Sequence, residues 1–295
     1  MNENPTLARL GYSPQDRVVI LHADDLGMCH AANSAFAKMV DFGWVRSGSV
    51  MVPCPWFLEL AEYANAHPQI DMGVHLTLNS EWSQYRWGPI STHERISGLL
   101  NSQGYFPRTV EQLHDQFDPQ AALAEMRAQI ERALECGIDV THIDTHMGSM
   151  AHRDLLPGYV DLALEYKIPC LTALLSYNKL LEWGLDPDLA GQFQERYDQL
   201  LEAGQPFVDH LTFVEDRSSG SALEQFKKVF DALEPGLTHF FIHPTVPGED
   251  IEAITEDAPN RVVDYEMMVS AELRDYVQEQ GIHVIGYRSL RELVE

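Results

Sequence analysis

RVVILHADDLG, at residues 17–27, joins a short apolar run to a pair of carboxylates and decides the fold. The length and β-branched content of the first six residues are typical of a strand that is buried in a sheet. Asp24 and Asp25 follow where such a strand ends. We therefore expect a buried strand whose carboxyl end carries chemically active side chains.

The same alternation of apolar runs and amphipathic stretches continues along the chain. Further strands are expected at residues 47–52, 70–78, 140–146, 170–174, 207–212, 238–243 and 283–287. Helices are expected at residues 31–42, 56–66, 119–136, 155–166, 177–205, 221–233, 269–280 and 289–294. Strands that alternate with helices form a largely parallel sheet. Seven or eight largely parallel strands in one series favour an α/β protein with a TIM-barrel-like (β/α) barrel.

The domain organisation follows from the same series. No repeat, low-complexity tract or Gly/Ser linker divides the sequence, which predicts a single catalytic domain over residues 1–295. Residues 79–108 form a long, aromatic loop insertion in it. A loop of this length is typical of a functional lid or of a loop packed on itself.

Composition narrows the partners and the compartment. The chain has 45 acidic and 20 basic residues and a formal net charge of -25. This charge either serves solubility or favours a neutral or cationic small substrate, and it argues against nucleic acid and anionic membranes. The four cysteines form no CxxC pair, so free thiols in a reducing compartment are expected. Without a signal-peptide pattern or a long apolar span, the sequence predicts a cytoplasmic protein.

Asp and His residues recur at the expected ends of four strands. Asp24 and Asp25 end the first, His75 lies late in the third, His146 ends the fourth, and His243 ends the strand at 238–243. Each residue taken alone could be a helix cap or a hydrogen-bonded core residue. In a parallel barrel, however, the carboxyl ends of the strands meet at one rim, where active sites lie. Their common position predicts one site.

The residue types at this rim indicate metal-assisted hydrolysis. One carboxylate of the Asp pair, with His75 and His146, would give three protein ligands and leave positions for water and substrate. A metal ion there lowers the pKa of bound water and polarises a carbonyl. Asp24 would take the proton from that water, and His243 could donate one to the leaving group. Zinc or magnesium is the expected divalent ion, and cobalt and manganese stay open.

Other residues near these positions have more than one interpretation. His142 either orients a ligand or packs beneath the site. Asp144 either holds His146 or His243 by a hydrogen bond or makes a plain buried polar contact. His22 is expected to point into the barrel wall. The remaining histidines show no constellation and are expected to be structural or on the surface: His30, His67, His93, His114, His152, His210, His239 and His283.

Four motifs together resemble the YdjC-like carbohydrate deacetylases, also called the ChbG/HpnK family. They are ADDLG at 23–27, GVHLTL at 73–78, HIDTH at 142–146 and the HP pair at 243–244. SGSVMV at 47–52 and the ending from Arg261 to Tyr287 are similar as well. The resemblance therefore extends from about residue 17 to residue 288.

The resemblance implies a distorted (β/α) barrel related to the polysaccharide deacetylases. It implies one divalent metal ion on Asp25, His75 and His146, with Asp24 as the base and His243 as the acid. The family reaction removes an acetyl group from an N-acetylated sugar, often a chito-oligosaccharide.

Residues around the motifs bear on the substrate. His142, Asp144 and Arg261 are expected to support the metal ligands or to contact the substrate. Family members commonly carry a run like DSHQHxH where this chain reads DTHMGSM at 144–150. The metal ligands are kept, but the residues expected to form the wall of the substrate site differ. The identity of the sugar therefore stays open. Trp82, Trp87 and Tyr105 of the insertion either provide platforms for a sugar ring or pack the lid: neither interpretation is favoured.

Other functions remain compatible with the sequence. A metal-dependent amidase or another hydrolase could use the same site on a non-sugar substrate. A glycoside hydrolase needs two carboxylates that flank a substrate bond, and adjacent Asp24 and Asp25 are not an obvious flanking pair. A catalytically inactive metal- or sugar-binding protein could dispense with Asp24 and His243, which are both present. A homodimer is the base-rate expectation for the assembly.

Overall fold

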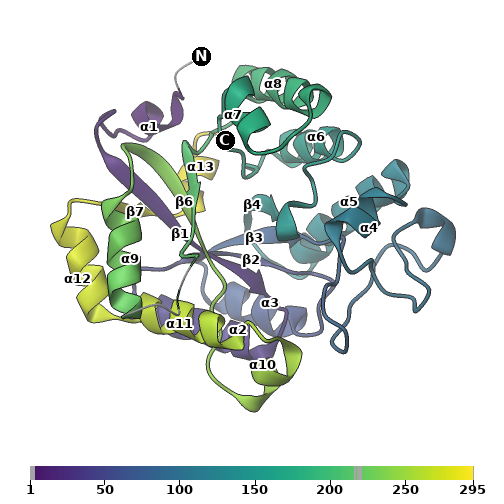
Figure 1. Cartoon of the computed structure of the whole chain (residues 1–295), viewed down its shortest axis with the longest axis horizontal. Coiled ribbons are helices and arrows are strands. Elements are labelled where there is room, and N and C mark those ends of the chain that lie inside the picture. Colours follow the sequence, from purple (N-terminus) through teal and green to yellow (C-terminus); the bar gives the residue numbers. More distant parts are fainter. Residues whose placement is uncertain (1–3, 216, 218–220, 295) are drawn as a thin grey trace.

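The computed structural model describes residues 4–215, 217 and 221–294, and within them one sheet of seven strands runs through the molecule (Figure 1). The sheet order is β4-β3-β2-β1-β6-β5, and β7 pairs with β1. All strand pairs are parallel, which confirms the predicted α/β class. The strands are β1 Arg17–Leu26, β2 Ser47–Val50, β3 Asp71–Leu76, β4 Val140–Thr145, β5 His210–Thr212, β6 Gly236–Ile242 and β7 His283–Ile285.

Isolated parallel bridges close this sheet between β4 and β5. Ile143 pairs with Cys170, and Ala173 pairs with Val208, just before β5. The amide of Leu171 donates to the carbonyl of Ile143 at 2.8 Å, so the link has ordinary ladder hydrogen bonds. The strand expected at 170–174 is thus reduced to two bridges, and the result is a distorted barrel.

The barrel is also irregular beside β1. β6 pairs with one edge of β1 from Arg17 to Ala23, whereas two strands, β7 and β2, share the other edge. β7 pairs there with residues 18–20, and β2 pairs from His22 onward. Tyr287, just after β7, is buried, and its amide donates to Ser47 Oγ at 3.2 Å. β7 and Tyr287 therefore enter between the amino ends of β1 and β2.

Helices surround the sheet (Figure 1). The predicted helices are present with shifted ends, except that the one expected at residues 177–205 is divided into two helices, α7 and α8. Helices α1, α4, α10 and α11 were not predicted. The helices are α1 Thr6–Arg9, α2 His30–Phe42, α3 Phe57–Ala66, α4 Val110–His114, α5 Pro119–Glu135, α6 Leu156–Tyr166, α7 Tyr177–Glu182, α8 Pro187–Glu202, α9 Ala222–Asp231, α10 Glu249–Ile254, α11 Ala258–Met268, α12 Ala271–Glu279 and α13 Tyr287–Arg291. Short 3-10 turns lie at η1 Arg95–Ser97 and η2 His146–Gly148.

Helix α5 illustrates how local sequence sets these boundaries. The Asp118 carboxylate accepts a hydrogen bond from the amide of Ala121 at 2.8 Å, which caps the first turn. Pro119 occupies a position where the missing N–H is not needed. Gly137 ends the helix with a φ of +85°, as its position in the sequence predicts.

The barrel interior is closely packed where β3 pairs with β4. A Cβ atom at Gly73 would lie 2.5 Å from Cε1 and 2.7 Å from Cδ2 of His142, which real side chains do not allow. Gly73 therefore makes room for the His142 ring. This contact places a buried imidazole beneath the carboxyl edge of the sheet.

The insertion at 79–108 contains η1 and otherwise irregular backbone. Trp87 is buried, and its indole N–H donates to the carbonyl of Asn79 at 2.9 Å. Trp82 packs against Trp87 with ring centroids 5.4 Å apart, whereas Tyr105 is 40% exposed. Trp87 therefore packs the insertion, as one of the two interpretations predicted.

The free-thiol prediction is confirmed for all four cysteines, of which Cys136 is partly exposed and the other three are buried. In the described part of the chain, none of the helices has the length and apolar character that a membrane crossing requires.

Candidate active site

The five predicted site residues meet at the carboxyl edge of the sheet. Asp24 and Asp25 lie near the end of β1, His75 lies in β3, and His146 and His243 directly follow β4 and β6. Asp25 Oδ1 lies 3.5 Å from His75 Nε2 and 3.1 Å from His146 Nδ1. Asp24 Oδ2 lies 3.9 Å from His243 Nε2.

A backbone irregularity lets two consecutive carboxylates serve one site. Asp25 has a φ of +59°, and the pairing of β1 with β2 shifts register between Ala23 and Leu26. Asp tolerates this left-handed conformation better than most residues. Asp24 and Asp25 consequently contact different partners at the same edge instead of pointing to opposite faces of a regular strand.

Asp25, His75 and His146 form a buried group of potential metal ligands. Their donor atoms all lie within 4.8 Å of one another. Among the described residues, Asp25 Oδ1 is buried without a hydrogen-bond partner. A buried carboxylate oxygen without a partner requires an explanation, and a divalent cation shared with two imidazoles provides one. The residues present therefore fit a metal ion.

Arg261 balances the charge of Asp25 from the other side. Its guanidinium nitrogen lies 2.8 Å from Asp25 Oδ2, and its cationic centre lies 5.6 Å from the Trp82 ring. Burial raises the pKa of Asp25, but Arg261 and His146 outweigh burial and hold that pKa well below its ordinary value. Asp25 is thus kept as a carboxylate.

Asp144 supports His75. His75 Nδ1 lies 2.9 Å from Asp144 Oδ1, and Ser49 Oγ donates to Asp144 Oδ2 at 2.8 Å. The prediction that Asp144 holds His146 or His243 was wrong, because β3 and β4 are adjacent and their register places His75 opposite Asp144. A proton on Nδ1 leaves the Nε2 lone pair of His75 directed toward Asp25.

His146 has a carboxylate partner that the sequence did not reveal. Its Nε2 lies 3.0 Å from Glu81 Oε2, at the start of the insertion. Burial lowers the pKa of His146, but Glu81 and Asp25 raise it more, to about 9. Both histidines of the ligand group thus face a carboxylate with the ring nitrogen that points away from Asp25.

Asp24 and His243 lie at the accessible side of this group. His22 Nδ1 contacts Asp24 Oδ1 at 2.6 Å, which fixes one carboxylate oxygen. The amide of His243 donates to Asp264 Oδ2 at 2.9 Å, and Arg217 binds both oxygens of Asp264 at 2.7 and 3.0 Å. The His243 side chain is 35% exposed, so it can reach a substrate.

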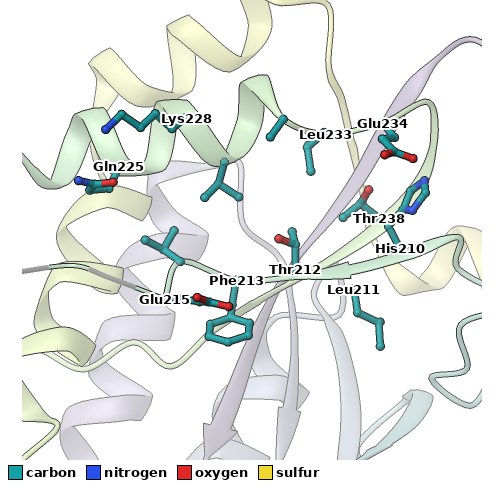
Figure 2. Close-up of a pocket in the computed structure, with 13 residues that line it drawn as sticks. His210, Leu211, Thr212, Phe213, Glu215, Gln225, Lys228, Leu233, Glu234 and Thr238 are labelled. Atoms are coloured by element: carbon teal, nitrogen blue, oxygen red, sulfur yellow. The ribbon is translucent and has the colours of Figure 1, made fainter. Parts of the chain in front are cut away.

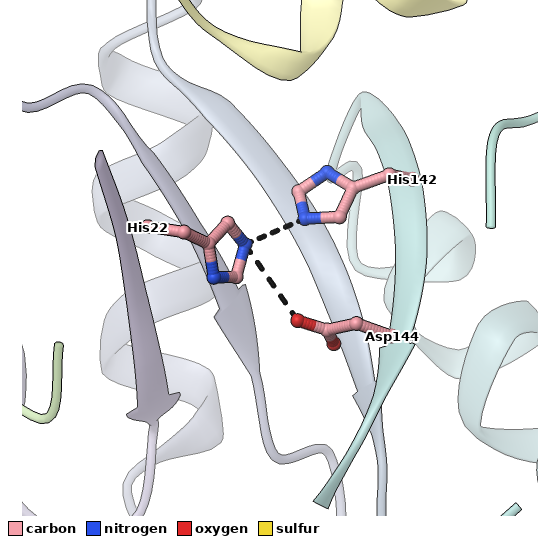
Figure 3. A group of neighbouring side chains, drawn as sticks. All are labelled: His22, His142 and Asp144. Carbon is pink, nitrogen blue, oxygen red and sulfur yellow. Dashed lines mark hydrogen bonds and ion pairs between the residues drawn. The ribbon is translucent and has the colours of Figure 1, made fainter. Parts of the chain in front are cut away.

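A chain of buried histidines lies beneath Asp24. His22 Nε2 lies 2.7 Å from His142 Nε2 and 3.7 Å from Asp144 Oδ2, and the three side chains converge from β1 and β4 (Figure 3). His142 stacks on Tyr287 with ring centroids 3.6 Å apart, and burial holds the pKa of His142 well below its ordinary value. His22, His142 and Asp144 also form a possible group of metal ligands, but the Nε2 atoms of the two histidines already share a hydrogen bond. We therefore favour the Asp25 group for a metal.

Two predictions about histidines need correction here. His22 reaches Asp24 and His142 instead of only filling the wall. His239 was expected to stand outside any constellation, yet its Nδ1 lies 2.8 Å from the Tyr287 hydroxyl and its ring lies 4.6 Å from that of His22. His142 packs beneath the site, which was one of its two predicted roles.

A separate cavity of about 470 Å³ lies beside β5 and α9 (Figure 2). His210, Thr212, Phe213 and Lys228 contribute to its walls. Within the described residues, none of the five predicted site residues lines it. Volume alone therefore does not locate the chemistry in this molecule.

A closed parallel barrel with carboxylates and imidazoles at its carboxyl edge defines a (β/α)-barrel protein with an enzyme-like site. The chain belongs to the YdjC-like protein family, whose model matches residues 18–279, and this confirms the resemblance. A protein from Thermus thermophilus named carbohydrate deacetylase is 30% identical over 286 residues, covering 97% of this chain and 98% of that protein.

Other relatives agree in length and fold. A protein from Thermoanaerobacter pseudethanolicus, also named carbohydrate deacetylase, is 23% identical over 275 residues, which are 93% of this chain and all of that protein. The crystal structure of a putative cellobiose-phosphate cleavage protein from Enterococcus faecalis matches with a TM-score of 0.77 and 23% identity. This match covers 93% of the present chain and 99% of that one, and it supports the fold.

Proposed function

We propose that this protein is a metal-dependent hydrolase that removes the acetyl group from an N-acetylated sugar. The observation that carries the proposal is the ligand group of Asp25, His75 and His146, with its unpartnered Asp25 oxygen, beside Asp24 and His243. The names of the full-length relatives support a sugar substrate. Zinc or magnesium, a cytoplasmic location and a homodimer stay predictions.

The three ligands would hold one divalent cation at the carboxyl edge of the barrel. Such an ion supplies positive charge that polarises an amide carbonyl and makes water a stronger acid. Asp144 and Glu81 each accept a hydrogen bond from one histidine of the group. These contacts fix both imidazole rings and their tautomers.

Asp24 would act as the general base. Because His22 occupies Oδ1 at 2.6 Å, Oδ2 is the oxygen left for the reacting water. Asp24 accepts one proton from this water as its oxygen bonds to the acetyl carbon. The buried His22 and His142 hold the carboxylate in that orientation from below.

His243 would act as the general acid. Its Nε2 lies on the Oδ2 side of Asp24, and Asp264 fixes its backbone. When the C–N bond breaks, His243 donates a proton to the leaving nitrogen, and acetate and the free amino sugar result. The Arg217 pair keeps Asp264 in place beneath this backbone.

The test combines metal content with acetate release. Elemental analysis should find about one metal ion per chain in the wild type and in Asp24→Asn, and much less in His146→Ala. Acetate should be released from N-acetylglucosamine oligomers by the wild type but by neither Asp24→Asn nor His146→Ala. His93→Ala, at an exposed histidine, is the matched control and should behave as wild type.

Each alternative has its own result. Metal without acetate from any N-acetylated sugar would discard the sugar substrate and favour an amidase on another substrate. Wild-type turnover retained in Asp24→Asn would remove Asp24 from the base role. Wild-type protein that binds no zinc or magnesium would refute the metal site.

A further inference from the structure

A solvent-exposed methionine directly follows His146, one of the three proposed metal ligands. The side chain of Met147 is 54% exposed. The other methionines of the described residues are buried, except for Met267, which is partly buried against the core. An oxidant in solution therefore reaches the sulfur of Met147 more easily than that of any other described methionine.

The backbone does not explain why a methionine occupies this position. Met147 has a φ of +53°, in the left-handed region, where residues other than glycine are uncommon. Glycine and asparagine adopt this conformation more easily. The side chain of Met147 therefore needs a reason of its own, and a contact of its sulfur provides one.

The Met147 sulfur contacts the first residue of the insertion. The side-chain amide of Asn79 donates to this sulfur, with Nδ2 and Sδ 3.0 Å apart. Asn79 is fully buried, and its Oδ1 has no hydrogen-bond partner among the described residues. In the described part of the chain, the buried amide side chain of Asn79 thus depends on the thioether for its hydrogen bond.

Asn79 connects Met147 to two side chains around His146. The backbone carbonyl of Asn79 accepts the indole N–H of Trp87 at 2.9 Å, and the Trp87 and His146 ring centroids lie 6.2 Å apart. Glu81, two residues after Asn79, lies 3.0 Å from His146 Nε2. A displacement of Asn79 therefore reaches His146 through both Trp87 and Glu81.

We propose that Met147 is an oxidation site, and that its conversion to methionine sulfoxide displaces Asn79 and weakens metal binding through His146. The inference goes beyond deacetylation, and its effect on metal binding rests on the proposed metal site. A hydroperoxide supplies the oxygen. The sulfur lone pair attacks the terminal peroxide oxygen, the O–O bond breaks, and the leaving oxygen takes the proton and departs as water or an alcohol. The sulfur is oxidised by two electrons, and the peroxide is reduced by two.

The added oxygen changes the contact between Met147 and Asn79. A sulfoxide is polar and chiral, unlike the thioether that it replaces, and the amide nitrogen already lies 3.0 Å from the sulfur. Either the amide moves to make room for the oxygen, or the oxidised side chain turns further into solvent. The second movement leaves a buried amide without a partner, which is unfavourable. Both movements disturb the start of the insertion, which carries Glu81.

The test treats the metal-loaded protein with limiting hydrogen peroxide and locates the added oxygen by peptide mass spectrometry. Met147 should be modified before Met267. Zinc affinity, measured by competition with a chelator, should then fall about tenfold, the lower end of what the loss of a supporting contact costs a metal site. Methionine sulfoxide reductases reverse this modification and should restore the affinity, whereas a thiol reductant alone should not.

Four variants separate this route from other oxidative damage. Met147→Leu removes the sulfur and should lose most of the response to peroxide. Met147→Gln, with a polar side chain of similar length, should reproduce the weaker zinc binding without peroxide. Asn79→Ala should still be oxidised at Met147 but show little further loss of zinc affinity. Met267→Leu is the matched control and should respond as wild type.

The inference and the proposed deacetylation fail separately. Oxidation of Met147 with unchanged zinc affinity, or with an equal loss of affinity in Asn79→Ala, would overturn the inference and leave acetate release intact. A loss of zinc affinity in a protein that releases no acetate would support the inference and overturn deacetylation. In a protein that binds no zinc, amide hydrogen exchange at residues 79–87 decides: faster exchange after oxidation would support the displacement of Asn79, and unchanged exchange would overturn it.

Discussion

Gly73→Ala is expected to destabilise the protein, although Gly→Ala is favourable at many positions. A Cβ atom at residue 73 would lie 2.5 Å from Cε1 and 2.7 Å from Cδ2 of His142. The His142 ring is stacked on Tyr287 and contacts His22 Nε2 at 2.7 Å. It can withdraw from the new methyl group only by giving up one of these contacts.

The magnitude follows from three effects. Overpacking a core costs about 1–3 kcal/mol, and a buried polar group left without its partner costs about 1–3 kcal/mol. The reduced freedom of the unfolded chain returns about 0.4–1 kcal/mol. A net loss of about 1–5 kcal/mol should lower Tm by about 2–10 °C, at roughly 2 °C per kcal/mol for a chain of this size.

Urea and thermal unfolding measure this loss. Gly191→Ala is the matched control, because Gly191 lies inside α8 and a Cβ there would meet no atom of the described residues within 4 Å. That variant should gain about 0.5–1 kcal/mol. A Gly73→Ala protein within 0.5 kcal/mol of wild type, a margin typical of surface substitutions, would refute the packing argument.

Three further predictions address the ligand group and the thiols. Asp144→Asn should lower metal affinity about 10- to 100-fold, because His75 loses its carboxylate partner; unchanged affinity by metal titration would contradict this. At pH 8, a thiol reagent should modify Cys136 first. Burial raises the pKa of the thiols of Cys29, Cys54 and Cys170 and keeps them protonated. Comparable modification rates for all four cysteines would contradict this prediction. Burial raises the pKa of Cys170 from 9.0 to about 11, so its contribution to stability is complete below pH 9 and is lost as the pH rises toward 11. Between pH 8 and 10.5, urea unfolding should show the wild type losing about 2 kcal/mol more than Cys170→Ala, and equal losses would exclude this origin.

The sequence was most informative where burial on both sides leaves a continuous apolar run. Residues 18–21 are such a run, and they lie in the central strand β1, Arg17–Leu26. Residues 170–174 are also mostly apolar, yet they form no continuous strand. Cys170 pairs only with Ile143 on one side, and Ala173 pairs only with Val208 on the other. α11 was missed because its buried side includes Arg261 and Asp264, so no continuous apolar stripe marks that side in the sequence.

The site was predictable as far as strand ends could be recognised. Asp25, His75 and His146 meet because parallel strands share one carboxyl edge. Their supporting contacts depend on which strands are neighbours and in what register, and a single sequence does not contain that information. Asp144 faces His75 for this reason, and Glu81 reaches His146 through the fold of the insertion.

The position of Tyr287 has a consequence for the order in which the protein can assemble during synthesis. His22 and His142 emerge from the ribosome long before Tyr287, the ring against which His142 stacks. β7 likewise pairs with the amino half of β1, which is translated near the beginning. The buried layer of His22, His142 and Tyr287 beneath the candidate site therefore cannot reach its final form until almost all of this sequence has been translated. Contacts between such distant segments slow folding, and the unfinished barrel exposes apolar surface during that delay.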